Sequence, residues 1–133
     1  MPEKHLFEYA VIRVVPRVER EEFINVGVIL YCSSRRFLQA EFDINEDRIK
    51  ALFPLIDLRE LYDRLCAFQH VCAGNAAGGP IAKLPIASRF RWLTAARSTI
   101  VQTSPVHPGL SEDPGEMLKR LMAEMVGNVE QGM

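Results

Sequence analysis

The first third of the chain carries runs of aromatic and β-branched residues with the side-chain alternation typical of β-strands. Residues 7–15 and 23–32 are apolar on both alternating faces, which predicts two strands inside a sheet. Residues 33–36 are polar and predict a turn. Residues 37–43 have one apolar and one largely polar face, so we predict that they pair with 23–32 as an antiparallel hairpin.

Two helices are predicted in the middle of the chain. Asn45 can cap a short helix over about 45–53. Asp57 and Glu60 have the spacing of a capping box, and the apolar residues that follow them recur every three or four residues. This pattern predicts a longer helix over about 57–73.

The remaining segments are of mixed character. Residues 76–80 predict a flexible connector, and residues 85–94 predict a short helix or a turn. Residues 98–103 favour a fourth strand, and the prolines of 104–109 predict an ordered loop. An Asp-Pro-Gly-Glu start predicts a C-terminal helix over about 114–126.

This order of elements predicts a single α+β domain, with an antiparallel sheet of about four strands and the helices packed on one side. The length of 133 residues fits one domain. The longest apolar stretch, 26–32, is far shorter than the roughly 18 residues that span a bilayer. Residues 1–4 lack the apolar core of a signal peptide. We therefore expect a cytoplasmic protein that does not enter a membrane.

The cysteines do not predict a metal site. Their odd number agrees with a reducing compartment. Cys66 and His70 would share one face of the predicted helix, but Cys72 is rotated away and no second pair of ligands follows. Buried cysteines are the simpler interpretation, and no cofactor is predicted.

Charge is segregated along the chain, although the net charge is only −1. Residues 76–104 hold four basic side chains and no acidic one. Carboxylates elsewhere in the fold, a partner or water must match these cations. A near-neutral chain is not a general polyanion binder, but the sequence is compatible with a local basic patch.

A first candidate cluster lies around the end of the first strand. Arg13 sits inside that strand, where a guanidinium needs a carboxylate, a carbonyl, solvent or a bound anion. Arg17 and Arg20 converge with it if the next loop folds back. Gly27 marks a bulge or a close approach by another backbone or a ligand, which Asn25 could bond. The alternatives are an ion pair of Arg13 with a nearby glutamate, and a bulge that Asn25 satisfies.

A second candidate cluster lies in and just after the region without acids. It combines guanidinium, hydroxyl and amide donors with an aromatic side chain, which suits contacts to phosphates or nucleobases and equally a polar protein–protein surface. Its histidine could act as a general base, although a histidine beside a proline is more often a loop residue. The members are Arg89, Arg91, Trp92, Arg97, Ser98, Thr99, Gln102, Ser104 and His107.

Two motif blocks coincide with these clusters. The first consists of Tyr9, Arg13-Val-Val-Pro16 and Arg20-Glu-Glu-Phe-Ile-Asn-Val-Gly-Val28. The second consists of Phe90-Arg-Trp-Leu-Thr94, Arg97-Ser98, Gln102, Ser104-Pro-Val-His107 and Gly109. Over nearly the whole chain the sequence resembles a family of small bacterial proteins catalogued only as a domain of unknown function. The resemblance implies no activity or cofactor, but it implies a protein partner, because members are often encoded beside HipA-type kinases.

Three functions follow as hypotheses. The leading one is a non-catalytic binding module in which converging arginines hold an anionic group of a phosphorylated protein, a nucleotide or a nucleic acid. The second is a protein-interaction subunit with an apolar patch such as the Met-rich last helix. The third is a phosphoester-cleaving enzyme with His107 as base and Ser98 or Thr99 as nucleophile, which the absence of known hydrolase motifs disfavours. A homo-oligomer stays open. The predicted ligand-binding residues are Arg13, Arg17, Arg20, Asn25, Arg91, Arg97, Ser98, Gln102 and His107.

Overall fold

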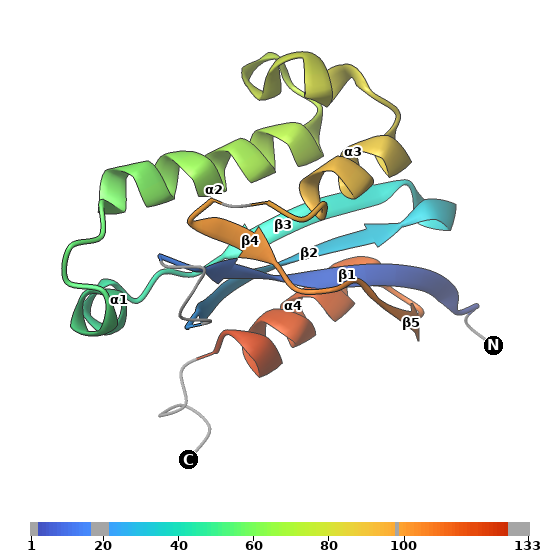
Figure 1. The fold of residues 1–133 in the computed structure, drawn as a ribbon. Helices are drawn as coiled ribbons and strands as arrows, with labels where there is room; N and C mark the ends of the chain where they lie inside the picture. Colours follow the sequence, from blue (N-terminus) through green and yellow to red (C-terminus); the bar gives the residue numbers. More distant parts are fainter. Residues whose placement is uncertain (1–2, 17–21, 98, 128–133) are drawn as a thin grey trace.

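An antiparallel sheet forms the centre of the protein (Figure 1). The computed structural model describes residues 3–16, 22–97 and 99–127. Within these ranges the sheet has five strands in the order β3-β2-β1-β4, and β5 pairs with β1 on the same edge as β4. The strands are β1 (His5–Val14), β2 (Ile24–Cys32), β3 (Phe37–Phe42), β4 (Val101–Thr103) and β5 (His107–Ser111).

The described ranges also hold four α-helices and two short 3-10 helices. They are α1 (Glu46–Leu52), α2 (Leu58–Ala73), α3 (Ile86–Leu93), α4 (Pro114–Met125), η2 (Ser33–Arg35) and η3 (Ala76–Lys83). None of the helices in this part of the chain is long and apolar enough to cross a membrane.

The helix boundaries follow the caps that the sequence predicts. The side chains of Asn45 and Asp57 each accept a backbone N–H three residues later at 3.1 Å. Asp113 accepts two N–H groups of the first turn of α4, at 2.9 and 3.2 Å. Gly74 ends α2 in the left-handed conformation, with φ of 71°.

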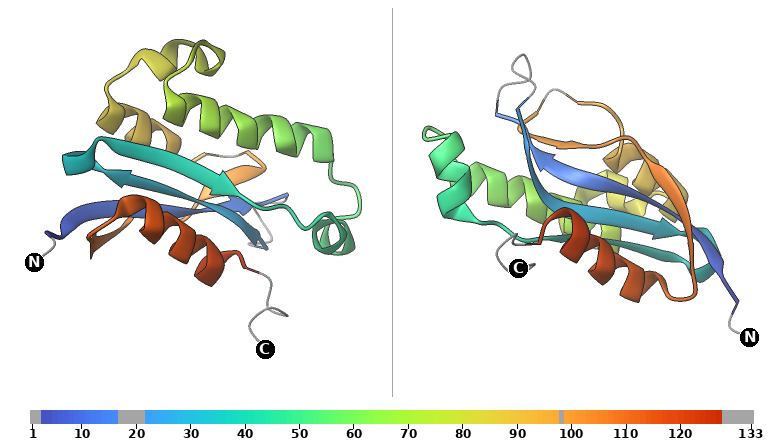
Figure 2. Two further views of the ribbon diagram at one scale, coloured as in Figure 1. Left: turned by 180° about the vertical axis from the view of Figure 1, so that it is seen from behind. Right: turned by 90° about the horizontal axis from the view of Figure 1, so that it is seen from below.

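The helices lie on both faces of the sheet (Figures 1 and 2). On the face here called the upper face, α2 and α3 bury an apolar core that includes Ile12 and Phe90. On the opposite, lower face, α4 packs mainly against β2, where Leu118 and Leu121 contact the cluster that includes Leu30. The α+β class and the antiparallel sheet are confirmed, whereas the prediction that all helices share one side is wrong. The lower side chains of β2 are apolar and require a cover of their own.

The packing of α4 also bears on the predicted interaction patch. Met122 and Met125 are half-buried against the lower-face cluster. The apolar stripe of this helix therefore covers the sheet and is not an exposed patch.

Three segments differ from the prediction. Residues 76–80 are not a flexible connector but the first part of η3, which packs against α2 and buries Ala82. The segment 104–109, predicted to be a loop, contains the start of β5. Because β5 is an edge strand, it tolerates Pro108. The fourth strand begins at Val101, later than predicted.

Candidate functional site

Three polar residues from three adjacent strands lie side by side on the lower face. Arg13 of β1 is directly opposite Asn25 of β2 on one side and Gln102 of β4 on the other. Directly opposite residues of antiparallel strands project to the same face, with Cβ atoms about 5 Å apart. We call these three residues the Arg13 row. All three were predicted from the sequence to be site residues, and the sheet register brings them together.

A β-bulge places Asn25 in this row. Arg13 pairs with Asn25, but the residue before Arg13 pairs with Gly27, so Val26 is the additional residue of β2. Strand side chains alternate, so without the extra residue Asn25 would share the upper face with Gly27. Gly27 lies beside a bulge and is also closely approached by another backbone, as the sequence predicts. A Cβ at this position would collide with the carbonyl oxygen of Glu41 on β3.

The Arg13 guanidinium has no acidic partner among the described residues. Its Cζ atom lies 4.1 Å from the centre of the Phe23 ring, in a cation–π contact. Its Nε is fully enclosed and lacks a hydrogen-bond partner within the described ranges. Neither Nη atom forms a hydrogen bond with another described residue, and the Arg13 side chain as a whole is half-buried. Four residues that could approach Arg13 lie outside the described residues: Arg17, Glu19, Arg20 and Glu21.

The two amides beside Arg13 are each anchored through their nitrogen. The Nδ2 of Asn25 donates to the carbonyl oxygen of Met125, at the end of α4, at 3.2 Å. The Nε2 of Gln102 donates to the carbonyl oxygen of Thr99 at 3.0 Å. The Oδ1 of Asn25 is enclosed and has no partner in the described part of the chain. Buried polar atoms normally have partners, so two such atoms in one row mark an unusual place in the fold.

Arg91, another predicted site residue, lies on the other face of the sheet. It donates to both carboxylate oxygens of Glu8, at 2.7 and 2.8 Å. Glu8 is opposite Tyr31, whose ring stacks on Phe90 in the upper core. The hydrogen bond to Glu8 raises the pKa of Arg91 above its ordinary value. The structure thus gives Arg91 an internal counter-charge and separates it from Arg13.

Arg89 and Arg97 are also held by the protein's own backbone. Arg89 donates to the carbonyl oxygens of Val71 and Cys72 at the end of α2, both at 2.9 Å. Arg97 lies over the Trp92 ring, with Cζ 3.9 Å from the ring centre, and donates to the Trp92 carbonyl. Burial lowers the pKa of Arg97. Arg97 has no acidic partner among the described residues, but it lies in the loop between α3 and β4, outside the Arg13 row.

The residues assigned to catalysis do not form a nucleophile–base pair among the described residues. His107 is opposite Tyr9 on the lower face, with ring centres 5.4 Å apart. The Thr99 hydroxyl donates to the Val101 carbonyl at 2.7 Å, and Ser98 lies outside the described residues. The Ser104 hydroxyl is buried and accepts the Val11 N–H at 2.8 Å, which is a structural role.

Phe23, whose ring lies against Arg13, was not among the predicted site residues. Residues two positions apart in a strand lie on the same face, so the spacing of Phe23 and Asn25 could have predicted that the ring lies beside the row. No group of three or more metal-binding side chains occurs within the described ranges.

A family model described as "Protein of unknown function (DUF3037)" matches residues 9–126. Comparison with curated proteins and with solved structures found no match.

Proposed function

The chain belongs to this family of proteins of unknown function, and we propose that it is a non-catalytic binding module that holds an anionic group at Arg13. The observation that carries the proposal is the state of Arg13. Its charge lies near the end of β1, a strand with neighbours on both sides, between two amides and with no described acidic partner. A guanidinium in such a place is costly unless solvent or an anion completes its hydrogen bonds.

The row suits an oxyanion. A guanidinium presents two N–H groups in one plane, which match two oxygens of a phosphate or a carboxylate. The Phe23 ring lies against the Arg13 guanidinium and restricts its motion, so less freedom is lost on binding. The Nε atom is enclosed, so the ligand approaches the outer end of the guanidinium. The proposal rests on one arginine between two amides, because Arg91 is paired with Glu8, and Arg17 and Arg20 lie outside the described residues.

Several ligands share this chemistry, so the test uses four probes. They are inorganic phosphate, a phosphoserine peptide, a nucleoside monophosphate and a short single-stranded oligonucleotide. We expect at least one to bind, with an affinity that falls as salt rises, because the contact is electrostatic. Arg13→Met keeps the aliphatic stem on Phe23 but removes the charge, and it should abolish this binding.

Arg91→Ala is the matched control, because Arg91 is paired with Glu8 on the other face. It should bind each probe as the parent protein does. Equal binding of every probe by Arg13→Met and the parent would refute the proposal.

A further inference from the structure

A second surface lies where α1 meets α2, in an open groove of about 530 Å³. Its lining is mostly apolar, with Leu52 from the end of α1, Phe53 and Ile56 from the connection between the helices, and Ile100 from the segment before β4. It shares no lining residue with the Arg13 row.

The groove has a fixed lining and an exposed apolar rim. Phe53, Ile56 and Ile100 are half-buried and pack against the upper core, so the core holds them in place. In contrast, Leu55 is 99% exposed and Leu52 is 56% exposed. Single exposed leucines are common on protein surfaces, but these two lie at one groove, so apolar area that water now covers is available to a partner there.

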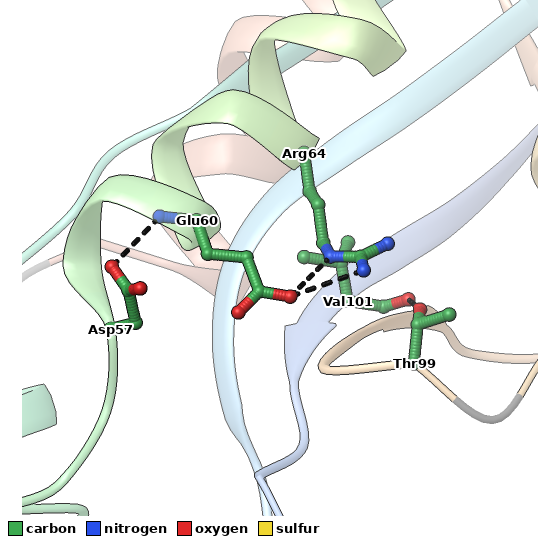
Figure 3. A network of polar contacts seen from close by, with 5 residues as sticks. All are labelled: Asp57, Glu60, Arg64, Thr99 and Val101. Atoms are coloured by element: carbon green, nitrogen blue, oxygen red, sulfur yellow. Dashed lines mark hydrogen bonds and ion pairs between the residues drawn. The ribbon is translucent and has the colours of Figure 1, made fainter.

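Among the described residues, the charged side chains that line the groove are Asp57 and Glu60, both acidic. Figure 3 draws them with Arg64, which contacts Glu60. Asp57 uses one carboxylate oxygen to accept the N–H of Glu60, at 3.1 Å. Arg64 donates from Nε, and its Nη2 also lies 3.1 Å from the same Oε1 of Glu60. The second oxygen of each carboxylate has no partner among the described residues. One arginine facing two carboxylates leaves negative charge in excess.

We propose that this groove docks a protein segment that inserts one large aliphatic side chain and places a neighbouring lysine or arginine against Asp57 and Glu60. The acidic lining favours a basic neighbour and disfavours an acidic one. A small molecule confined to the groove would leave Leu55 in water, whereas a protein segment that crosses the rim covers it. The inference does not depend on anion binding at Arg13.

Three short fluorescein-labelled peptides test the proposal by fluorescence polarisation. The first has leucines flanked by lysines, the second has glutamate in place of lysine, and the third has serine in place of leucine. We expect only the first peptide to bind, and its binding should shift the amide resonances of residues 52–60 in an NMR titration.

Surface variants identify the groove as the binding site. Leu55→Ser and Glu60→Lys should each weaken the leucine–lysine peptide about tenfold, the size expected for losing one apolar contact or one charge contact. Leu110→Ser is the matched control, because Leu110 is a 62% exposed leucine on β5, and it should bind as the parent does. Equal melting temperatures of the parent and the three variants would show that all of them fold.

Three results would overturn the proposal. Either no peptide binds, or the glutamate peptide binds as well as the lysine peptide, or neither Leu55→Ser nor Glu60→Lys weakens binding. Self-association of the parent that Leu55→Ser removes would also overturn it, because a second copy of the chain would then be the occupant.

Discussion

The two faces of the sheet differ in what covers them. On the upper face, α2 and α3 lie over a continuous apolar core, and Ile12 of β1 is fully buried. On the lower face, α4 lies mainly over β2, and the next residue of β1, Arg13, is only half-buried beside two amides. Of these two neighbouring residues of β1, Ile12 is thus part of the apolar core and Arg13 is part of the polar row. The polar row lies on the half-covered face, where a guanidinium can still reach solvent.

The covered face should be the more sensitive to truncation. Phe90 is fully buried, and its ring stacks on Tyr31 with ring centres 5.2 Å apart. Phe90→Ala should lower the free energy of unfolding by about 3–5 kcal/mol, through lost transfer energy and a cavity. Urea denaturation measures this change. A loss below about 1 kcal/mol would mean that the upper core does not hold the fold together.

The lower face should respond less to a comparable change. Leu118 of α4 is 1% exposed, but the half-buried methionines around it can move into the space that it leaves. Leu118→Ala should therefore cost about 2–3 kcal/mol, near the low end for such substitutions. The same urea titration gives the value, and a cost larger than that of Phe90→Ala would reverse the comparison.

The upper face should also make stability depend on alkaline pH. Burial raises the pKa of the Cys72 thiol from 9.0 to about 12, although Arg89 opposes the shift. Above pH 9 the unfolded chain can ionise this thiol and the folded chain cannot, so the free energy of unfolding falls between pH 9 and pH 12.

The part of this loss between pH 9 and pH 10 should be about 1 kcal/mol. Cys72→Ala should be less sensitive to pH than the parent by this amount in parallel denaturation series. Parallel slopes for the two proteins would show that the thiol ionises in the folded state.

The smallest expected effect on stability is that of Arg13→Met. This variant removes a charge whose Nε has no described partner and keeps the contact with Phe23. Its free energy of unfolding should stay within about 1 kcal/mol of the parent or rise, because an unpartnered buried donor is lost. A loss of several kcal/mol would instead identify Arg13 as a structural residue.

The parts of the fold that depend on local signals could be predicted from the sequence. Asn45, Asp57 and Asp113 cap their helices as predicted, because a cap involves only residues within one turn. The side on which α4 packs could not be predicted, because its apolar stripe would fit either face. The start of β5 was missed because Pro108 disfavours a strand unless the strand lies at an edge, and the edge position depends on the whole sheet.

The candidate site was predictable in the same partial way. Arg13 and Asn25 were predicted because polar residues inside predicted strands are unusual, and Gln102 was predicted as one of the polar donors of the second cluster. Their alignment depends on a bulge and on the pairing of β1 with β4, which are long-range features. The pairing of Arg91 with Glu8 joins residues 83 positions apart, and the sequence around neither residue predicts it.

The most direct test of the central claim follows the side-chain Nε–H resonance of Arg13 by NMR while each of the four anionic probes is added in turn. The resonance is assigned by its loss in Arg13→Met, and that of Arg91 serves as the internal reference. If the Arg13 row holds an anion, the Arg13 resonance shifts and saturates with at least one probe, while that of Arg91 stays in place. An Arg13 resonance that does not move with any probe, or that moves no more than that of Arg91, would contradict the account.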